Sequence, residues 1–353
     1  MNTEIFHRLV LKAANDDVTI PNAGKPRWIR KLNDSDSSLM AKSEISSQLK
    51  VTRHIRAIQI EYNKVCHFGV LGHIEKSGTP DGLLPTEITP GLFSVIVTES
   101  DIQPSVTGLE ILDAIGDLYA GETEFDGFDL SDISKLFPYI TVYEADQNYE
   151  YTLNVTRVLG ALIARSYSDG PIGPSASTLA KVSSLFEAGS EHVPFENILQ
   201  GLLSISWGGF FLELYRAVEQ LYAVPRLSGL VEAWPTPLPY RQLADLLESH
   251  LSWRPKEDDA LAKIIGECDG EVVKSLIDSF CSDRAADQET SPEKVAKEIY
   301  KVRNRLVHFR TALGKATHTD DEWDRMISAM LDLVQDIYRR HGKRFNMEQQ
   351  EAQ

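Results

Sequence analysis

The chain has 353 residues, a length that suits about two domains of roughly 100–200 residues each. Its hydrophobic content of 42% and charged content of 25% are ordinary for a folded soluble protein. The formal net charge of −16 argues against a protein that coats nucleic acid indiscriminately, because such proteins need a broadly basic surface.

The spacing of the cysteines and the length of the apolar runs indicate the cellular compartment and whether a metal site is present. Cys66, Cys268 and Cys281 form no CxxC pair and no even framework, which favours reduced thiols over a disulfide scaffold or a zinc site. The N-terminal segment lacks the positive-then-apolar layout of a signal peptide, and no run approaches the roughly 18 apolar residues of a spanning helix. We therefore predict a cytoplasmic protein without membrane contact, metal or cofactor.

Residues 1–168 are predicted to form a mixed, β-rich α/β domain. The alternation of apolar and polar residues in 55–62 is typical of a half-buried strand, and residues 105–119 carry helical spacing. Further strands are predicted at 66–74, 92–97, 139–144 and 150–155. The sequence does not decide whether this domain senses a signal, positions a substrate or binds a partner.

Two histidines in this half permit a metal-site interpretation. His67 and His73, with Glu75 nearby, could share one face of a strand, since side chains repeat every two residues. No third ligand is evident, which favours structural histidines. The glycines of this half show neither dinucleotide-binding nor Walker spacing, so no phosphate-binding loop is predicted.

A linker is predicted at 169–176, because residues 168–175 hold two Gly, two Pro and two Ser. After it the apolar period changes from two to about 3.6. Helices are predicted at 177–188, within 198–222, and at 240–250, 259–268, 271–281 and 320–341, with Gly208 and Gly209 expected to mark the start of the second or a close helix contact. The fold class is therefore α+β: an N-terminal mixed domain followed by an all-α domain over 177–345, with a tail at 346–353.

The apolar spacing in residues 291–310 predicts one helix, and its first residues are typical of a helix start. Ser291 can accept a hydrogen bond from the first turn, and Pro292 fits the first helical position. Asn304 and His308 are four residues apart and fall on the side opposite the apolar stripe. Arg303 lies at the edge of that polar side, which is expected to project away from the core. The apolar stripe consists of Val295, Ile299, Val302, Leu306 and Phe309.

The same region is locally basic. Between Glu293 and Lys315 there are seven basic residues and two acidic ones. A basic zone on an acidic body suits an enzyme that touches a polyanion at one place. The alternative is a solvated helix face with charges that favour the helix dipole.

The segment from Arg303 to His308, RNRLVH, resembles the signature of the HEPN superfamily. That signature is an Arg, a polar residue that is often Asn, about three further residues and a His, on a helix of a small all-α domain. Many members are metal-independent ribonucleases of toxin, abortive-infection and other prokaryotic defence systems. The resemblance extends at most over residues 176–342.

The resemblance implies roles for individual residues. Arg303 and His308 would be catalytic, with Asn304 in support. Family members often carry an acidic or polar residue on the helix that faces the motif, and Glu219 matches that description; the alternative is a surface or salt-bridged glutamate. Further supporting or RNA-binding residues would be Arg305, Lys301 and Arg310.

The chemistry of RNA cleavage suits these residue types. The ribose 2′-OH is the nucleophile, a histidine can transfer protons near neutral pH, and an arginine can hold phosphate with two parallel bonds. One motif supplies one histidine, so a homodimer is expected to complete the site and to leave a 2′,3′-cyclic phosphate and a 5′-hydroxyl. An antitoxin or another defence-system protein is a possible further partner.

Two alternatives to the ribonuclease hypothesis stay open. The helical domain could be a non-catalytic HEPN-like module that binds a nucleotide, nucleic acid or a partner protein. The match could also be accidental, in which case the helix carrying His308 is purely structural.

Overall fold

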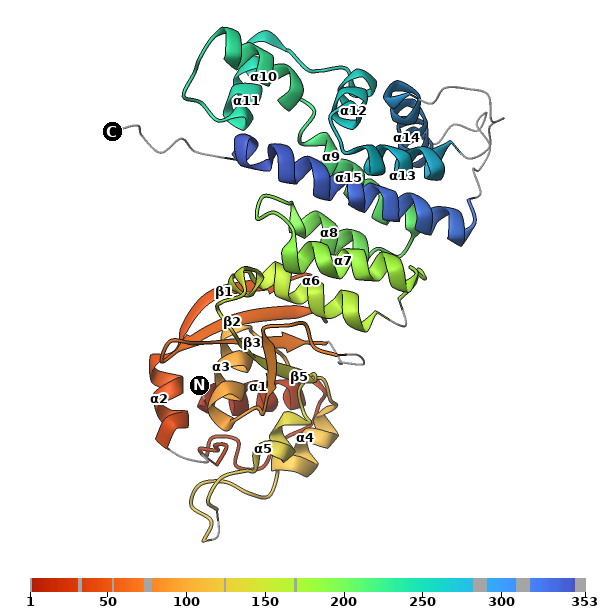
Figure 1. Cartoon of the computed structure of the whole chain (residues 1–353). Helices are drawn as coiled ribbons and strands as arrows, with labels where there is room; N and C mark the ends of the chain where they lie inside the picture. The colour runs from red at the N-terminus through yellow and green to blue at the C-terminus, as the bar shows by residue number, and fades with distance from the viewer. Residues whose placement is uncertain are drawn as a thin grey trace. The chain divides into compact units, whose positions relative to one another are not determined.

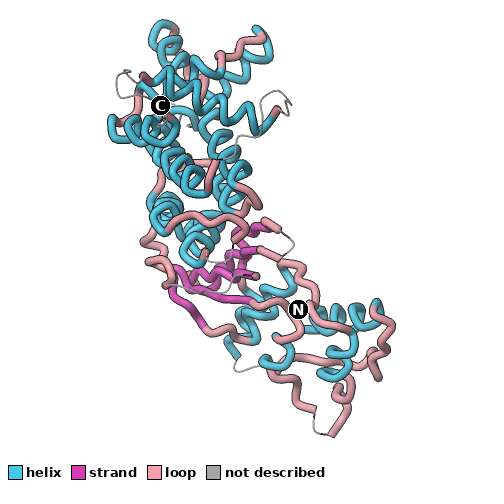
Figure 2. The backbone as a smooth tube through the Cα atoms, turned by 90° about the vertical axis from the view of Figure 1, so that its right-hand side faces the viewer, coloured by secondary structure: helices cyan, strands magenta, loops and turns pink. Residues whose placement is uncertain are grey.

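The chain folds into two compact units, Met1–Ser166 and Tyr167–Gln353 (Figure 1). Strands occur in the first unit, whereas the described part of the second is helical (Figure 2). The protein is therefore α+β, with the boundary just before the predicted linker. A computed structural model describes residues 2–30, 34–52, 54–72, 78–123, 125–167, 170–281, 291–308 and 318–346.

The first unit contains a five-stranded antiparallel sheet in the order β1-β2-β3-β5-β4. Asn63 and Lys64 join β2 to β3 with φ angles of 51° and 65°, the left-handed backbone that a tight two-residue hairpin requires. The strands are β1 (Glu44–Lys50), β2 (Arg56–Tyr62), β3 (Val65–Leu71), β4 (Leu83–Thr86) and β5 (Ile140–Ala145).

Helices bury both faces of this sheet. One face, with Ile58 and Ile60, shares a core with α1 and α3, and Gly69 lets Ile96 approach the strand closely. The helix α6 contacts β1 and β2 and lies on the side of the sheet opposite α1 and α3 in Figure 1. The helices are α1 (Asn2–Asn15), α2 (Asp34–Lys42), α3 (Pro90–Glu99), α4 (Gly108–Ile115), α5 (Leu130–Ser134) and α6 (Val155–Ser166).

The structure corrects two predicted strands. Residues 92–97 belong to α3, where the Thr89 side chain accepts a hydrogen bond from the Leu92 N–H at 3.2 Å and Pro90 occupies the first turn. A short run that is buried on all sides has no period that separates strand from helix. Residues 150–155 form a 3-10 turn (Glu150–Leu153) and the start of α6, where the Asn154 side chain accepts from two backbone N–H groups.

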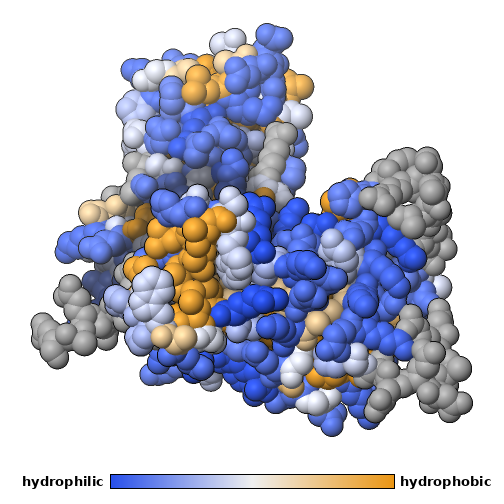
Figure 3. Space-filling view, turned by 90° about the horizontal axis from the view of Figure 1, so that it is seen from above, coloured by the Kyte–Doolittle hydropathy of each residue, from blue (hydrophilic) through white to orange (hydrophobic). Residues whose placement is uncertain are grey.

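Helices pack around α15 in the second unit, because this longest helix contacts α7, α9, α11 and α13. The described helices are α7 (Ala176–Ala188), α8 (Phe195–Leu202), α9 (Trp207–Glu219), α10 (Val224–Ala233), α11 (Tyr240–Leu251), α12 (Glu257–Gly266), α13 (Gly270–Phe280), α14 (Pro292–Val307) and α15 (Asp320–Asn346). Figure 3 shows a largely hydrophilic surface with apolar side chains gathered in places. The most exposed large apolar side chains of this unit, Ile205, Trp234 and Leu251, lie at or next to helix ends.

The structure decides two predicted helix boundaries in this unit. The helix predicted within 198–222 is α9, which begins at Trp207, next to the glycines at 208 and 209 that were expected to mark its start or a close contact, and the residues before it belong to α8. Ser206 caps α9 by accepting a hydrogen bond from the Gly209 N–H at 3.2 Å. The last helix continues past Gly342, where its end was predicted. A side chain at Gly342 would lie 2.7 Å from the Cβ of His192, so this glycine serves a close contact and does not end the helix.

Four aspartates on α15 hold neighbouring helices through hydrogen bonds or ion pairs. They recur at intervals of four, eight and four residues, which spreads them over nearly half of the helix circumference, so they reach different neighbours. The contacts are Asp320 with Trp207 Nε1 at 2.9 Å, Asp324 with the Ser175 N–H at 2.9 Å, Asp332 with Lys181 Nζ at 2.6 Å, and Asp336 with the Asp269 N–H at 3.1 Å. Within the described residues, none of the helices is both long and apolar enough to span a bilayer.

Asp336 is the most buried of these carboxylates, with 4% of its side chain exposed. Burial by itself raises the pKa of Asp336. Hydrogen bonds donated by Arg340, the Asp269 N–H and Arg339 outweigh burial and bring that pKa below its ordinary value. The folded state is therefore stabilised by the ionised carboxylate.

We expect Asp336→Asn to lower the free energy of unfolding by about 2 kcal/mol at pH 7, because it weakens hydrogen bonds to charged groups. The contribution is fully present above the ordinary aspartate pKa of about 3.9 and is lost as the pH falls through the lower folded-state pKa. Urea unfolding between pH 7 and pH 3 measures this, with Asp278→Asn on the exposed side of α13 as the matched control. A difference between wild type and Asp336→Asn that stays constant over this range would contradict the assignment.

Candidate active site

The motif helix α14 begins as predicted but is capped differently. It starts at Pro292 after the N-cap residue Ser291. The side chain of Ser291 hydrogen-bonds to Glu293 and holds the pKa of that carboxyl below its ordinary value. The residues predicted to face the core do so in the first three turns, where Val295, Ile299 and Val302 are buried.

The end of α14 differs from the prediction of a helix running to residue 310. The last helical residue is Val307, and His308 is the C-cap with an extended backbone (φ −107°, ψ 108°). Leu306 of the predicted stripe is 37% exposed, and its side chain lies close against Gly208 of α9. Phe309 and Arg310 lie outside the described residues.

Arg303 points into the helical unit, which corrects the expectation that it projects away from the core. Its side chain is 20% exposed, and Nη2 lies 3.9 Å from Oε2 of Glu257 on α12. Nη1 donates to Asn304 Oδ1 at 3.0 Å, and the guanidinium carbon lies 5.8 Å from the centre of the Tyr215 ring on α9. The apolar period of α14 does not predict this inward direction of Arg303, because Glu257 and Tyr215, which contact the guanidinium, belong to other helices.

Glu219 belongs to the same cluster. Burial raises the pKa of Glu219, the charge of Glu257 raises it further, and the charges of Arg303 and Arg216 lower it in part. The acidic residue predicted to face the motif helix therefore lies within electrostatic range of Arg303. Ion pairs of this kind also occur in purely structural clusters, so the arrangement alone does not assign a role.

Sequence reasoning missed Glu257 and Tyr215. The helices predicted at 240–250 and 259–268 leave Glu257 in the connection between them, but Glu257 begins α12 and its carboxylate reaches Arg303. Its position in an acidic first turn was the available signal, since Glu257, Asp258 and Asp259 together favour a helix start. Tyr215 lies on the broad apolar face of α9 and looked like any other core residue.

The cluster also contains buried polar atoms. The buried hydroxyls of Tyr215 and Tyr222 interact with each other, whereas Oε2 of Glu257 accepts no hydrogen bond within the described residues and has Arg303 Nη2 at 3.9 Å. Burial raises the pKa of both tyrosines, so both stay neutral.

The remaining motif residues lie toward the end of α14. The His308 side chain is exposed, and the His308 N–H donates to the Asn304 carbonyl at 2.9 Å. The half-buried Asn304 uses its side-chain oxygen to accept from Arg303, which leaves its amide N–H groups as donors. The arrangement can therefore offer a proton-transfer group at the helix end and a fixed cation one turn earlier.

The predicted supporting residues Lys301 and Arg305 line a different region. Arg303 and Arg305 are two positions apart, about 200° around the helix, so their side chains leave α14 on nearly opposite sides. Lys301 and Arg305 line a pocket of about 290 Å³ between α13, α14 and α15. Lys301 Nζ lies 2.8 Å from Glu298 Oε1.

The histidines of the first unit give no metal site in the described residues. His67 on β3 is buried, and burial lowers its pKa. His73 and Glu75 lie outside the described residues. Across the described ranges, no group of three or more His, Cys, Asp or Glu side chains is placed to hold a metal ion.

Comparisons with known proteins add no relative: no protein-family model matches the chain, and neither does any curated protein or solved structure. The HEPN resemblance therefore remains a prediction that depends on the residues from Arg303 to His308.

We expect Arg303→Ala to lower the free energy of unfolding by about 2 kcal/mol at pH 7, because Glu219 and Glu257 would lose the cation that acts on both of them. Adding Glu219→Gln to that variant should restore about 1 kcal/mol, since it removes one of the two like charges. Denaturant unfolding of the four proteins of this cycle measures the coupling.

Glu271→Gln, on the exposed side of α13, is the matched control in the Arg303→Ala background and should restore nothing. Because the pKa of Glu219 is raised, its ionisation opposes folding, and this effect grows as the pH rises from about 4.3 through the folded-state pKa. The restoration by Glu219→Gln should therefore be larger at pH 7 than at pH 4. Equal values at both pH values would show that the two carboxylates do not interact.

Proposed function

We propose that the chain is a metal-independent endoribonuclease that cleaves RNA through His308 and Arg303, as the HEPN resemblance implies. The observation that carries the proposal is the exposed imidazole of His308, placed directly after a helix whose last turn holds the Arg303–Asn304 pair. By the same resemblance, the enzyme would act in antiviral defence or as a toxin, inside the cytoplasm and under the control of an antitoxin or another defence-system protein.

The proposed reaction needs no group beyond the side chains and the RNA. The 2′-oxygen of the ribose forms a bond to phosphorus while its proton passes to a neutral imidazole. The bond from phosphorus to the 5′-oxygen breaks, and a protonated imidazole gives that leaving oxygen a proton. The products are a 2′,3′-cyclic phosphate and a 5′-hydroxyl.

Arg303 would stabilise the charge that develops on the phosphate oxygens. Its guanidinium is oriented by Glu257, Asn304 and the Tyr215 ring, and its exposed part can donate N–H groups to a phosphate oxygen. A fixed cation requires little reorganisation during the reaction, which is the property that makes such groups effective. Asn304 can donate an amide N–H to the same phosphate.

One chain supplies one motif histidine, whereas the reaction uses a base and an acid. A second copy would supply the other imidazole, so the proposed active form is a homodimer with the two His308 side chains across a shared cleft. The exposure of His308 supports this, because the side chain is accessible to a partner.

We expect wild-type protein to cleave RNA in the presence of EDTA and His308→Ala to be at least about 100-fold slower, the usual effect of losing a general acid or base. Arg303→Ala should also be impaired, provided that its unfolding transition lies above the assay temperature. His250→Ala, at the exposed end of α11, is the matched control and should cleave like wild type. Equal rates for wild type, His308→Ala and His250→Ala would reject the proposal.

We expect subunit mixing to reveal the paired site. When an excess of His308→Ala is mixed with wild type, most wild-type subunits enter heterodimers that contain one imidazole, so the rate per wild-type subunit should fall. Sedimentation at the assay concentration establishes that dimers form and exchange. A rate per wild-type subunit that is unaffected by the excess, with exchange demonstrated, would mean that each chain acts alone.

A binding module without catalysis is the second candidate, and the inward position of Arg303 favours it. A guanidinium held near Glu257 and Glu219 has part of its charge balanced before any phosphate arrives. This candidate predicts that a dimer or complex requires the His308 face while RNA stays intact in every variant.

A further inference from the structure

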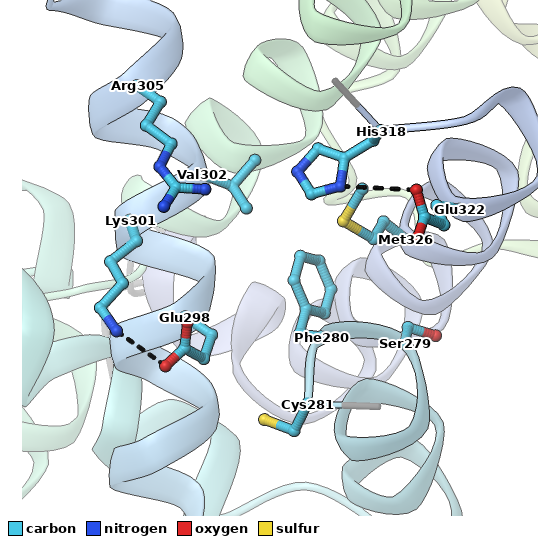
Figure 4. A pocket seen from close by; sticks show the side chains of 10 residues that line it. All are labelled: Ser279, Phe280, Cys281, Glu298, Lys301, Val302, Arg305, His318, Glu322 and Met326. Carbon is cyan, nitrogen blue, oxygen red and sulfur yellow. Dashed lines mark hydrogen bonds and ion pairs between the residues drawn. The ribbon is translucent and has the colours of Figure 1, made fainter. Parts of the chain in front are cut away.

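A second cluster of basic side chains lines the pocket between α13, α14 and α15 (Figure 4). The pocket has a volume of about 290 Å³. Arg305 and Lys301 enter it from α14, and His318, just before α15, faces them from the opposite wall. Arg303 and Glu219 take no part in it.

Arg305 is the cation of this pocket that remains available. Within the described residues it makes no ion pair or hydrogen bond, whereas Lys301 is paired with Glu298 at 2.8 Å. A guanidinium presents several N–H donors in one plane and binds phosphate or carboxylate with two parallel bonds. An anion that enters the pocket therefore meets an uncompensated positive charge.

His318 supplies a second donor on the other wall. Its Nδ1 lies 3.8 Å from Oε2 of Glu322, and in Figure 4 the other ring nitrogen is on the side of Val302 and Arg305. That nitrogen, Nε2, is buried and has no hydrogen-bond partner within the described residues. Buried polar atoms are normally hydrogen-bonded, so Nε2 is suited to a ligand oxygen.

The two carboxylates of the pocket are already engaged. Glu298 is bound to Lys301, and Glu322 accepts a hydrogen bond from the Thr319 N–H at 2.8 Å. The Thr319 N–H holds the pKa of Glu322 below its ordinary value, so Glu322 stays ionised and keeps its position at the start of α15. Within the described residues, neither carboxylate forms an ion pair with Arg305.

The rest of the lining is apolar and aromatic. Phe280, Val302 and Met326 lie between the two polar walls, and the Phe280 ring points into the space between them (Figure 4). Phe280 is held from behind by Phe211, with ring centres 6.2 Å apart. A volume near the lower end of ligand pockets, about 300 Å³, suits a compact molecule with one ring.

We propose that this pocket binds a phosphate monoester that carries an aromatic group. The phosphate lies between the Arg305 guanidinium and His318 Nε2, and the aromatic group packs against Phe280. Two sources share this chemistry, a free mononucleotide and the 5′-phosphorylated end of an RNA strand. The site does not depend on the proposed cleavage, because none of the groups assigned to the reaction lines it.

The test is equilibrium binding by calorimetry, with the full chain carrying His308→Ala so that RNA stays intact. The probes are inorganic phosphate, phenyl phosphate, phenol and adenosine 5′-monophosphate. We expect phenyl phosphate to bind about ten-fold or more tightly than inorganic phosphate or phenol, since only it engages both parts of the pocket.

Arg305→Gln should weaken phenyl phosphate binding about ten-fold or more, through loss of a charged hydrogen-bond donor. Arg241→Gln, on the exposed side of α11, is the matched control and should bind like the parent. His318→Ala should weaken all phosphate-containing probes. Phe280→Leu should keep inorganic phosphate binding and lose the preference for phenyl phosphate.

Two short RNAs of one sequence, with a 5′-phosphate and with a 5′-hydroxyl, distinguish the sources. Tight binding of adenosine 5′-monophosphate assigns a free mononucleotide. Binding of the 5′-phosphorylated RNA alone assigns an RNA end. Equal binding of phenyl phosphate by the parent, Arg305→Gln and Arg241→Gln, or no binding of any phosphate probe, overturns the proposal whether or not the wild-type chain cleaves RNA.

Discussion

The contact between Arg303 and the carboxylates of two other helices sets the position of α14. The guanidinium lies 3.9 Å from Glu257 on α12, within electrostatic range of Glu219 on α9 and over the Tyr215 ring. This contact and the burial of Val295, Ile299 and Val302 together favour one rotation of α14. That rotation directs Arg305 into the pocket on the other side and determines where the chain emerges at His308.

The helix with the motif was predictable from sequence because its first three turns obey one rule. Val295, Ile299 and Val302 repeat at helical spacing and are buried, and Pro292 begins the helix. The direction of Arg303 was not predictable, because it depends on the carboxylate of Glu257 in α12. Spacing within one helix carries no information about polar groups that other helices bring near.

The errors in the rest of the fold have related causes. The run 92–97 is buried on every side in α3, so it lacks the amphipathic period by which a helix is recognised. The break between α8 and α9 depends on Ser206, which caps α9. It is a single polar residue inside an apolar stretch, and the spacing of apolar residues does not indicate it. By contrast, the hairpin of β2 and β3 follows from local alternation and a two-residue turn, and β2 was predicted almost in full.

The C-cap position of His308 has a mechanical consequence. His308 has an extended backbone. Among the described residues, its N–H donates a hydrogen bond to the Asn304 carbonyl at 2.9 Å, which links its main chain to the helix. Rotation about the N–Cα bond of this one residue would move the ring by several ångströms and keep that hydrogen bond, because the N–H precedes the rotating bond. A docking subunit or a strand of nucleic acid could thus aim the imidazole without repacking any helix, and the geometry of this side chain is set by whatever meets it.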